Sequence, residues 1–168
     1  MSLADKISFK MMSFYHETLY SLFRDPYEVL RAAGVTEGQR VLEIGCGPGF
    51  FTVPAGEIVG TKGSVNAIDI NSIAIQHVRE KVSKGPVRNI EVSRVDAADT
   101  EFSDEKFDLV FVFGLARSKG STLGEIWREA FRVLKADGIL SVEGGINPPE
   151  DLFERTDRRG RIDKFVKA

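Results

Sequence analysis

The stretch that decides the fold is Arg40-Val41-Leu42-Glu43-Ile44-Gly45-Cys46-Gly47-Pro48-Gly49, a short apolar segment that runs straight into three glycines. Pro54 follows a few residues later. Because proline is tolerated only in the first turn of a helix, a helix must begin at about Gly49 to Phe51. The glycine loop therefore joins a strand to a helix N-terminus, where backbone N–H groups can approach a ligand closely.

Strands and helices alternate on both sides of this loop. Phe107–Phe113 is almost entirely apolar, as expected of a central strand that is covered on both faces. Helices are expected over Pro26–Ala33, between Asn71 and Gly85, and from Thr122 to Leu134. The pattern predicts an α/β fold with an open, mostly parallel, doubly wound sheet, helices on both faces, and a ligand site at the strand carboxyl ends. The expected strands are Arg40–Ile44, Ser64–Ile70, Asn89–Val95, Phe107–Phe113 and Ile139–Glu143.

The residues after the glycines separate three classes of ligand. A phosphate-binding P-loop ends in Gly-Lys-Ser/Thr, whereas Phe50, Phe51 and Thr52 stand here. A dinucleotide-binding loop needs a small third residue where helix and strand pack closely, and position 50 is again phenylalanine. An adenosyl ligand is the third class, and nothing in the loop argues against it.

Acidic residues stand at the ends of three successive strands. Glu43, Asp69 and Asp96 are separated by 26 and 27 residues. In a parallel sheet such positions lie at one edge, so all three side chains are expected to face one crevice. Each residue alone could equally serve a turn or a cap. Cys46 is expected to contribute its backbone rather than a reactive thiol.

The acidic-x-Gly-x-Gly-x-Gly pattern after a strand resembles the first motif of the class I S-adenosylmethionine-dependent methyltransferases, and the chain resembles their small, type 11-like members over about Asp25 to Glu143. The resemblance implies a Rossmann-like sheet of order 3-2-1-4-5, with S-adenosylmethionine as cofactor and S-adenosylhomocysteine as product. In the family, the residue at Asp69 accepts both ribose hydroxyls. The residue at Asp96 accepts the adenine amino group, while a neighbouring N–H serves a ring nitrogen. The expected cofactor-binding residues are Glu43, Gly45, Cys46, Gly47, Gly49, Asp69, Ile70, Asp96, Ala97 and Phe113.

The resemblance implies transfer of a methyl group to an unidentified acceptor, which we expect to be a small molecule. Positioning the acceptor behind an already activated methyl group supplies much of such a rate, and the sequence identifies neither a general base nor a metal site. Two alternatives stay open. One is a non-catalytic subunit that holds the adenosyl cofactor within a larger complex, and the other is an NAD-linked oxidoreductase, against which Phe50 argues.

The two ends of the chain carry weaker patterns. The aromatic segment within residues 1–24 is expected to form a helix or a lid, with Tyr15 and His16 as candidates for substrate contact, and residues 25–168 are expected to form the cofactor-binding domain. Only 25 residues follow Glu143, where the family adds a helix and two strands. We expect one helix near Pro149–Arg155 and one strand near Arg161–Val166, antiparallel at the sheet edge.

The composition of the chain limits the partners and the cellular compartment that we expect for it. The formal net charge of −2 and the isoelectric point near 5.8 argue against sequence-independent nucleic-acid binding. A single cysteine fits a reducing compartment, and no apolar run approaches the roughly 20 residues of a membrane-spanning helix. We therefore expect a cytoplasmic protein with a small-molecule partner, whose oligomeric state the sequence leaves open.

Overall fold

A computed structural model of the 168-residue chain describes residues 24–113 and 122–168. The N-terminal segment expected to form a helix or a lid, including Tyr15 and His16, lies outside the described residues, apart from Arg24. The segment 114–121 after the fourth strand also lies outside them.

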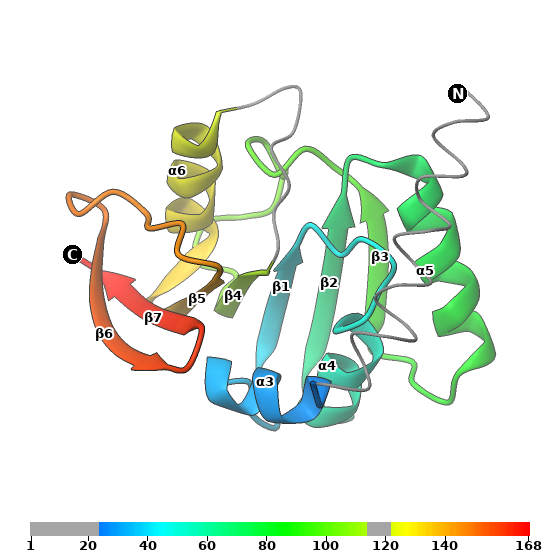
Figure 1. Ribbon diagram of the computed structural model, residues 1–168. Helices are drawn as coiled ribbons and strands as arrows, with labels where there is room; N and C mark the ends of the chain where they lie inside the picture. The colour runs from blue at the N-terminus through cyan, green and yellow to red at the C-terminus, as the bar shows by residue number, and fades with distance from the viewer. Residues whose placement is uncertain (1–23, 114–121) are drawn as a thin grey trace.

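Within these described residues, one sheet of seven strands forms the centre (Figure 1), in the order β3-β2-β1-β4-β5-β7-β6. The first five strands are parallel, and β7 is antiparallel to both β5 and β6. The predicted order 3-2-1-4-5 is therefore confirmed. The strands are β1 (Arg40–Ile44), β2 (Ser64–Asp69), β3 (Ile90–Arg94), β4 (Phe107–Phe113), β5 (Leu134–Glu143), β6 (Phe153–Arg159) and β7 (Ile162–Lys167).

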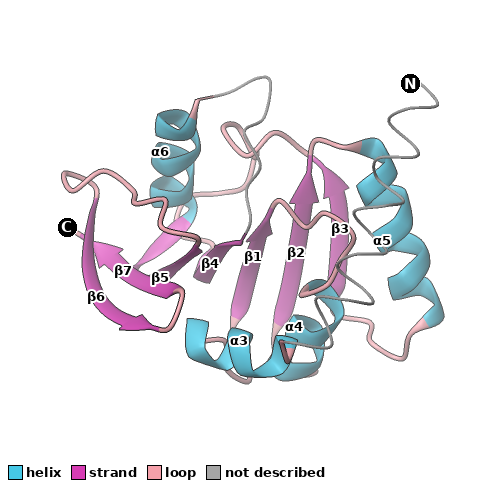
Figure 2. Cartoon of the chain, viewed as in Figure 1, coloured by secondary structure: helices cyan, strands magenta, loops and turns pink. Residues whose placement is uncertain are grey.

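Helices cover both faces of the sheet. Along β1, Val41 packs into a cluster with α3 and α4, whereas Leu42 and Ile44 pack into a cluster with α6. Because successive side chains of a strand point to opposite faces, these two clusters lie on opposite sides of the sheet. Figure 2 shows α3 beside α4 at one end of the strands, with α5 and α6 on opposite flanks. The helices are α3 (Pro26–Ala33), α4 (Thr52–Val59), α5 (Ser72–Lys84) and α6 (Leu123–Val133).

The capping residues begin three of these helices where the sequence predicts. Asp25 accepts a hydrogen bond from the Tyr27 N–H at the start of α3, and Asn71 accepts one from the Ile73 N–H at the start of α5. Thr122 and Glu125 form a reciprocal capping box on α6. These bonds satisfy N–H groups that have no partner within the helix, which is why the side chains mark the boundaries so well.

Strand β4 is the central strand, as its apolar sequence predicts. Leu109 and Phe111 pack into the cluster with α3 and α4, and the alternating residues Val110 and Val112 pack into the cluster with α6. All four side chains are at most 2% exposed. The neighbouring β5 begins at Leu134 rather than at the predicted Ile139, because Leu134 already pairs with β4 ahead of a register shift.

The C-terminal prediction is wrong in one respect. No helix forms within residues 144–168: the chain turns at Pro149, whose carbonyl accepts hydrogen bonds from the Leu152 and Phe153 N–H groups, and β6 then begins. Phe153 is buried, and its ring lies 5.6 Å from that of Phe131 on α6, so tertiary packing fixes this segment as a strand. The predicted strand near Arg161–Val166 is present as β7, but it lies between β5 and β6 rather than at the edge.

Strands β6 and β7 contribute side chains to the core, and a substitution that shortens one of these side chains tests this. Phe165 on β7 is 4% exposed and belongs to the cluster that packs against α6. We expect Phe165→Ala to lower the free energy of unfolding by about 3–5 kcal/mol through lost burial and a residual cavity. Urea denaturation measures the change. The half-buried neighbour Val166, changed to alanine, serves as the control and should cost much less; equal losses would show that β7 is not integrated into the core.

Candidate functional site

The glycine loop between β1 and α4 closes over the end of β2. The N–H groups of Gly45 and Cys46 both donate to the Ile68 carbonyl, at 2.9 and 3.0 Å, and the Gly49 N–H donates back to the Cys46 carbonyl at 2.8 Å. Gly45, Gly47 and Gly49 all have positive φ values, of 78°, 50° and 74°. An L side chain rarely adopts this conformation, so each turn of the loop favours glycine.

Two of these glycines serve different purposes. A Cβ atom at Gly49 would lie 2.8 Å from a methyl group of Val78 on α5, so this glycine allows the loop and the helix to pack together. A Cβ atom at Gly47 would meet nothing within 4 Å. Gly47 therefore leaves open space on the side where a ligand would approach.

Asp69 connects the loop to the end of β2. One carboxylate oxygen accepts a hydrogen bond from the Gly47 N–H at 2.9 Å, and the other accepts one from the Asn71 N–H at 2.8 Å. Both oxygens are oriented by backbone donors, and each keeps a lone pair for a further donor. The next residue, Ile70, is 41% exposed, which is unusual for a large apolar side chain among the described residues.

The end of β3 brings Asp96 to the same edge of the sheet. The Val95 N–H donates to the Asp69 carbonyl at 3.2 Å, which ties the two strand ends together. The Asp96 carboxylate is exposed and accepts a hydrogen bond from the Ala98 N–H at 3.0 Å. Ala97 is 9% exposed and packs into the cluster on the α6 side.

Glu43 departs from the expectation that all three acids face one crevice. Its side chain is 2% exposed and lies at the start of α4, where its carboxylate accepts a hydrogen bond from the Thr52 hydroxyl at 2.6 Å. Burial raises the pKa of Glu43 to about 8; the bond from Thr52 opposes this shift, and the nearby Asp69 adds to it. At neutral pH the Glu43 carboxyl is thus largely protonated.

The remaining predicted site residues are buried. Cys46 packs against Ala67 and Val78, and burial raises the pKa of its thiol well above the usual value, so the group stays protonated. Phe113, the last residue of β4, is 8% exposed, and its ring lies 5.1 Å from that of Phe51. The side chains of Cys46 and Phe113 belong to the core, so it is the backbone of these two residues that can face a ligand.

Two buried polar residues near the site were not singled out from the sequence. Thr52 is fully buried and bonds to Glu43, and Glu129 on α6 is 7% exposed and bonds to Thr100. Glu129 could have been noticed, because it is a charged residue within the apolar stripe of a predicted helix. Thr52 carried no signal of its own.

Residues 24–113 and 122–168 contain no group of three or more His, Cys, Asp or Glu side chains that could hold a metal ion. None of their helices is long and apolar enough to cross a membrane.

A loop of glycines at the carboxyl end of β1, with carboxylates at the ends of β2 and β3, defines a Rossmann-like protein with a site for a nucleoside-containing ligand. A family model described as a methyltransferase domain matches residues 41–138, more than half of the chain. The chain belongs to this methyltransferase family, as the resemblance of its glycine loop predicted. Membership of this family agrees with S-adenosylmethionine as the cofactor, which the resemblance implied.

Individual relatives support the same assignment. A demethylmenaquinone methyltransferase of Listeria monocytogenes is 30% identical over 115 residues, which cover 68% of this chain and 48% of that protein. A ubiquinone/menaquinone biosynthesis C-methyltransferase of Shewanella woodyi is 33% identical over 130 residues, covering 75% of this chain and 50% of the relative. The chain thus spans about half the length of these curated relatives.

A solved structure matches the fold over nearly its whole length. The S-adenosylmethionine-dependent methyltransferase of Aquifex aeolicus superposes with a TM-score of 0.72 at 24% identity, and the match covers 95% of both chains. The expected Rossmann-like methyltransferase fold is therefore confirmed.

The packing role of Gly49 can be tested by comparison with Gly47. We expect Gly49→Ala to lower the free energy of unfolding by about 2–4 kcal/mol, because it combines a strained φ with a clash against Val78. Gly47→Ala should cost only about 1 kcal/mol, because it has strain alone. Thermal or urea denaturation of both variants measures the difference, and equal losses would show that contact with α5 does not constrain the loop.

The raised pKa of Glu43 predicts a pH dependence of stability. Between the usual value of 4.5 and about 8, the folded state holds a proton that the unfolded state releases, so stability falls as pH rises through this window. We expect Glu43→Gln to reduce the loss of stability between pH 6 and pH 8.5, measured by urea denaturation. Glu37→Gln, at an exposed position, should keep the wild-type slope. An unchanged slope in Glu43→Gln would contradict the assignment.

Proposed function

We propose that this chain transfers the methyl group of S-adenosylmethionine to a small-molecule acceptor. The observation that carries the proposal is the glycine loop, which is closed onto β2 and lies beside two carboxylates at adjacent strand ends. The curated relatives act on quinone precursors according to their names, and a quinone-type ring is accordingly the first acceptor to test.

In this proposal the cofactor lies across the ends of β1, β2 and β3. Asp69 accepts the ribose hydroxyls on its remaining lone pairs, since a carboxylate offers two acceptors to two adjacent donors. Ile70 covers one face of the adenine ring, Asp96 accepts the adenine amino group, and the Ala97 N–H serves a ring nitrogen. The backbone of Gly45, Cys46, Gly47 and Gly49 lines the remainder, with Glu43 beneath it.

The acceptor is proposed to approach at the end of β4. Phe113 is the last described residue there, and it pairs in register with Glu143 at the end of β5. The bound cofactor supplies an activated methyl group on a sulfonium, so the residues of this chain act mainly by alignment and by excluding water. No described residue is assigned as a general base.

The alternative of a non-catalytic subunit has two supports: C-terminal strands that the family has were expected to be missing, and the segment after β4 lacks the substrate motif of the family. The first is removed, because β6 and β7 are both present, and the second keeps the alternative open. The proposal places the protein in a reducing compartment such as the cytoplasm, in keeping with the single cysteine, Cys46, which is buried and unpaired.

Two measurements on the purified chain test the proposal. Calorimetric titration should detect binding of S-adenosylmethionine and S-adenosylhomocysteine, and a cofactor labelled on its methyl group should transfer the label to a member of a small-molecule panel that includes quinone-type rings. Tight binding without transfer to any acceptor would favour the non-catalytic alternative. Absence of binding to both ligands would overturn the proposal.

The role of Asp69 gives a sharper prediction. Asp69→Ala removes a carboxylate with two ligand donors and is expected to weaken S-adenosylhomocysteine binding about 10- to 100-fold. Asp137→Ala, at an exposed position near the start of β5, is the matched control and should bind as the wild type does. Unchanged affinity in Asp69→Ala would place the cofactor elsewhere.

A further inference from the structure

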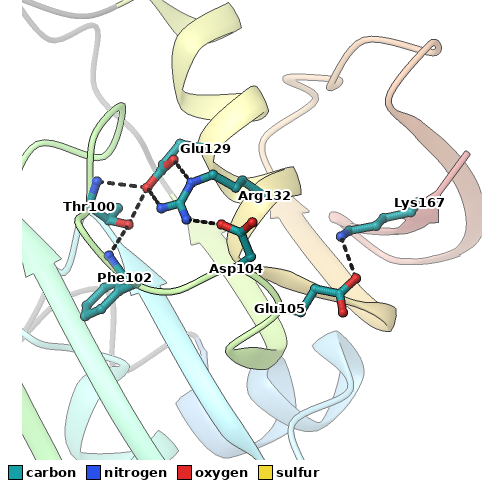
Figure 3. A network of polar contacts seen from close by, with 7 residues as sticks. All are labelled: Thr100, Phe102, Asp104, Glu105, Glu129, Arg132 and Lys167. Carbon is teal, nitrogen blue, oxygen red and sulfur yellow. Dashed lines mark hydrogen bonds and ion pairs between the residues drawn. The ribbon is translucent and has the colours of Figure 1, made fainter.

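A buried carboxylate on α6 lies at the centre of a polar network that reaches the connection between β3 and β4 (Figure 3). Glu129 is 7% exposed, and one of its oxygens accepts hydrogen bonds from the Thr100 N–H at 2.9 Å and from the Thr100 hydroxyl at 2.5 Å. Arg132, one turn further along the helix, donates to both Glu129 oxygens, at 2.7 and 2.8 Å. The carboxylate thus receives four hydrogen bonds in an interior position.

These bonds keep Glu129 charged although it is buried. Burial alone would raise its pKa, but the bonds from Arg132 and Thr100 outweigh that effect and lower the pKa to about 2. An ionised carboxylate in the interior costs several kcal/mol unless it is fully paired. Replacing a buried ion pair by well-packed apolar residues is often neutral or stabilising, so stability alone does not account for this network.

The partners that Glu129 and Arg132 contact outside α6 all belong to the connection between β3 and β4. Arg132 donates to Asp104 at 2.5 Å, and its carbonyl accepts a hydrogen bond from the Glu105 N–H at 3.0 Å. Residues 95–106, all described, form no helix, so this connection has no regular hydrogen bonding of its own beyond a bridge between Asp96 and Asp99. Two side chains of α6 therefore hold the connection at Thr100 and at Asp104.

The connection that α6 holds, residues 95–106, begins with the residues proposed to bind adenine. Asp96 stands four residues before Thr100, and the turn between them is closed by the Asp99 N–H, which donates to the Asp96 carbonyl at 3.1 Å. Thr100 is 3% exposed, so the end of this turn is fixed in the interior while Asp96 remains at the surface. A shift of Thr100 would be passed through this short turn to Asp96.

We infer that Glu129 is a positioning residue for the adenine subsite: by binding the backbone and hydroxyl of Thr100, it fixes Asp96 and Ala97 at the carboxyl end of β3. The inference rests on the proposed function, because it concerns the same cofactor site. Glu129 touches no ligand in this account and acts only through the connection that it holds.

The preference for a ligand that carries the adenine amino group is a quantity that a general loss of stability would not change. Affinities of S-adenosylhomocysteine and of its analogue with unsubstituted purine in place of adenine are compared by calorimetry, well below the melting temperature of each variant. Wild type should prefer the adenosyl ligand about 10-fold or more, the worth of one charge-assisted hydrogen bond. Glu129→Gln should reduce this preference to about threefold or less, because affinity for the adenosyl ligand falls more than affinity for the purine analogue, which keeps only the ring nitrogen that Ala97 serves.

Two further variants complete the experiment. Thr100→Val removes one hydrogen bond to Glu129 with little change of shape, and it should reduce the preference partly; it also tests the inference if Glu129→Gln does not fold. Glu101→Gln makes the same chemical change at an exposed position of the same connection and should keep the wild-type preference.

The outcomes separate the two claims. A wild type that binds neither ligand overturns the proposed function, and one that binds both equally overturns the role of Asp96 and the present inference with it. If wild type prefers the adenosyl ligand and both Glu129→Gln and Thr100→Val keep that preference in full, the inference alone is wrong.

Discussion

The tight turn after β1 is the constraint on which the rest of the site depends. Two successive N–H groups, of Gly45 and Cys46, share the Ile68 carbonyl, and this is possible only because the backbone turns through positive φ values. The turn brings Gly47 to the Asp69 carboxylate and places Gly49 against α5. The ends of β1, β2 and β3 are then linked in series, because Asp69 also accepts the Val95 N–H through its carbonyl.

Two buried glutamates show how differently one fold treats the same side chain. Glu43 receives one hydrogen bond, from Thr52, and burial raises its pKa to about 8. Glu129 receives four, two of them from a guanidinium, and its pKa falls to about 2. The balance between desolvation and donors decides the charge. Glu43, beneath the glycine loop, is thus neutral, and Glu129, which binds the connection that follows the adenine subsite, is charged.

The sequence predicts the first five strands because their signals are local, and their order follows from the resemblance to the methyltransferase family. Pro54 fixes where α4 can begin, the caps at Asn71 and Thr122 set two helix starts, and apolar runs set the strands. The C-terminal region lacks such signals: Phe153–Arg159 is mostly charged, and it forms a strand only because Phe153 packs against α6 and β7 supplies its hydrogen bonds. Likewise, adjacency of strand ends predicts that Asp69 and Asp96 lie at one edge of the sheet, whereas the burial of Glu43 depends on how α4 covers β1.

The central claim is that the cofactor binds across the ends of β1, β2 and β3. Chemical-shift mapping by NMR, with S-adenosylhomocysteine added to the isotope-labelled chain, tests it most directly. The account predicts that the largest amide shifts occur at residues 45–49, 69–71 and 96–98. Shifts concentrated on the β6–β7 hairpin, or no shifts at saturating ligand, would contradict it.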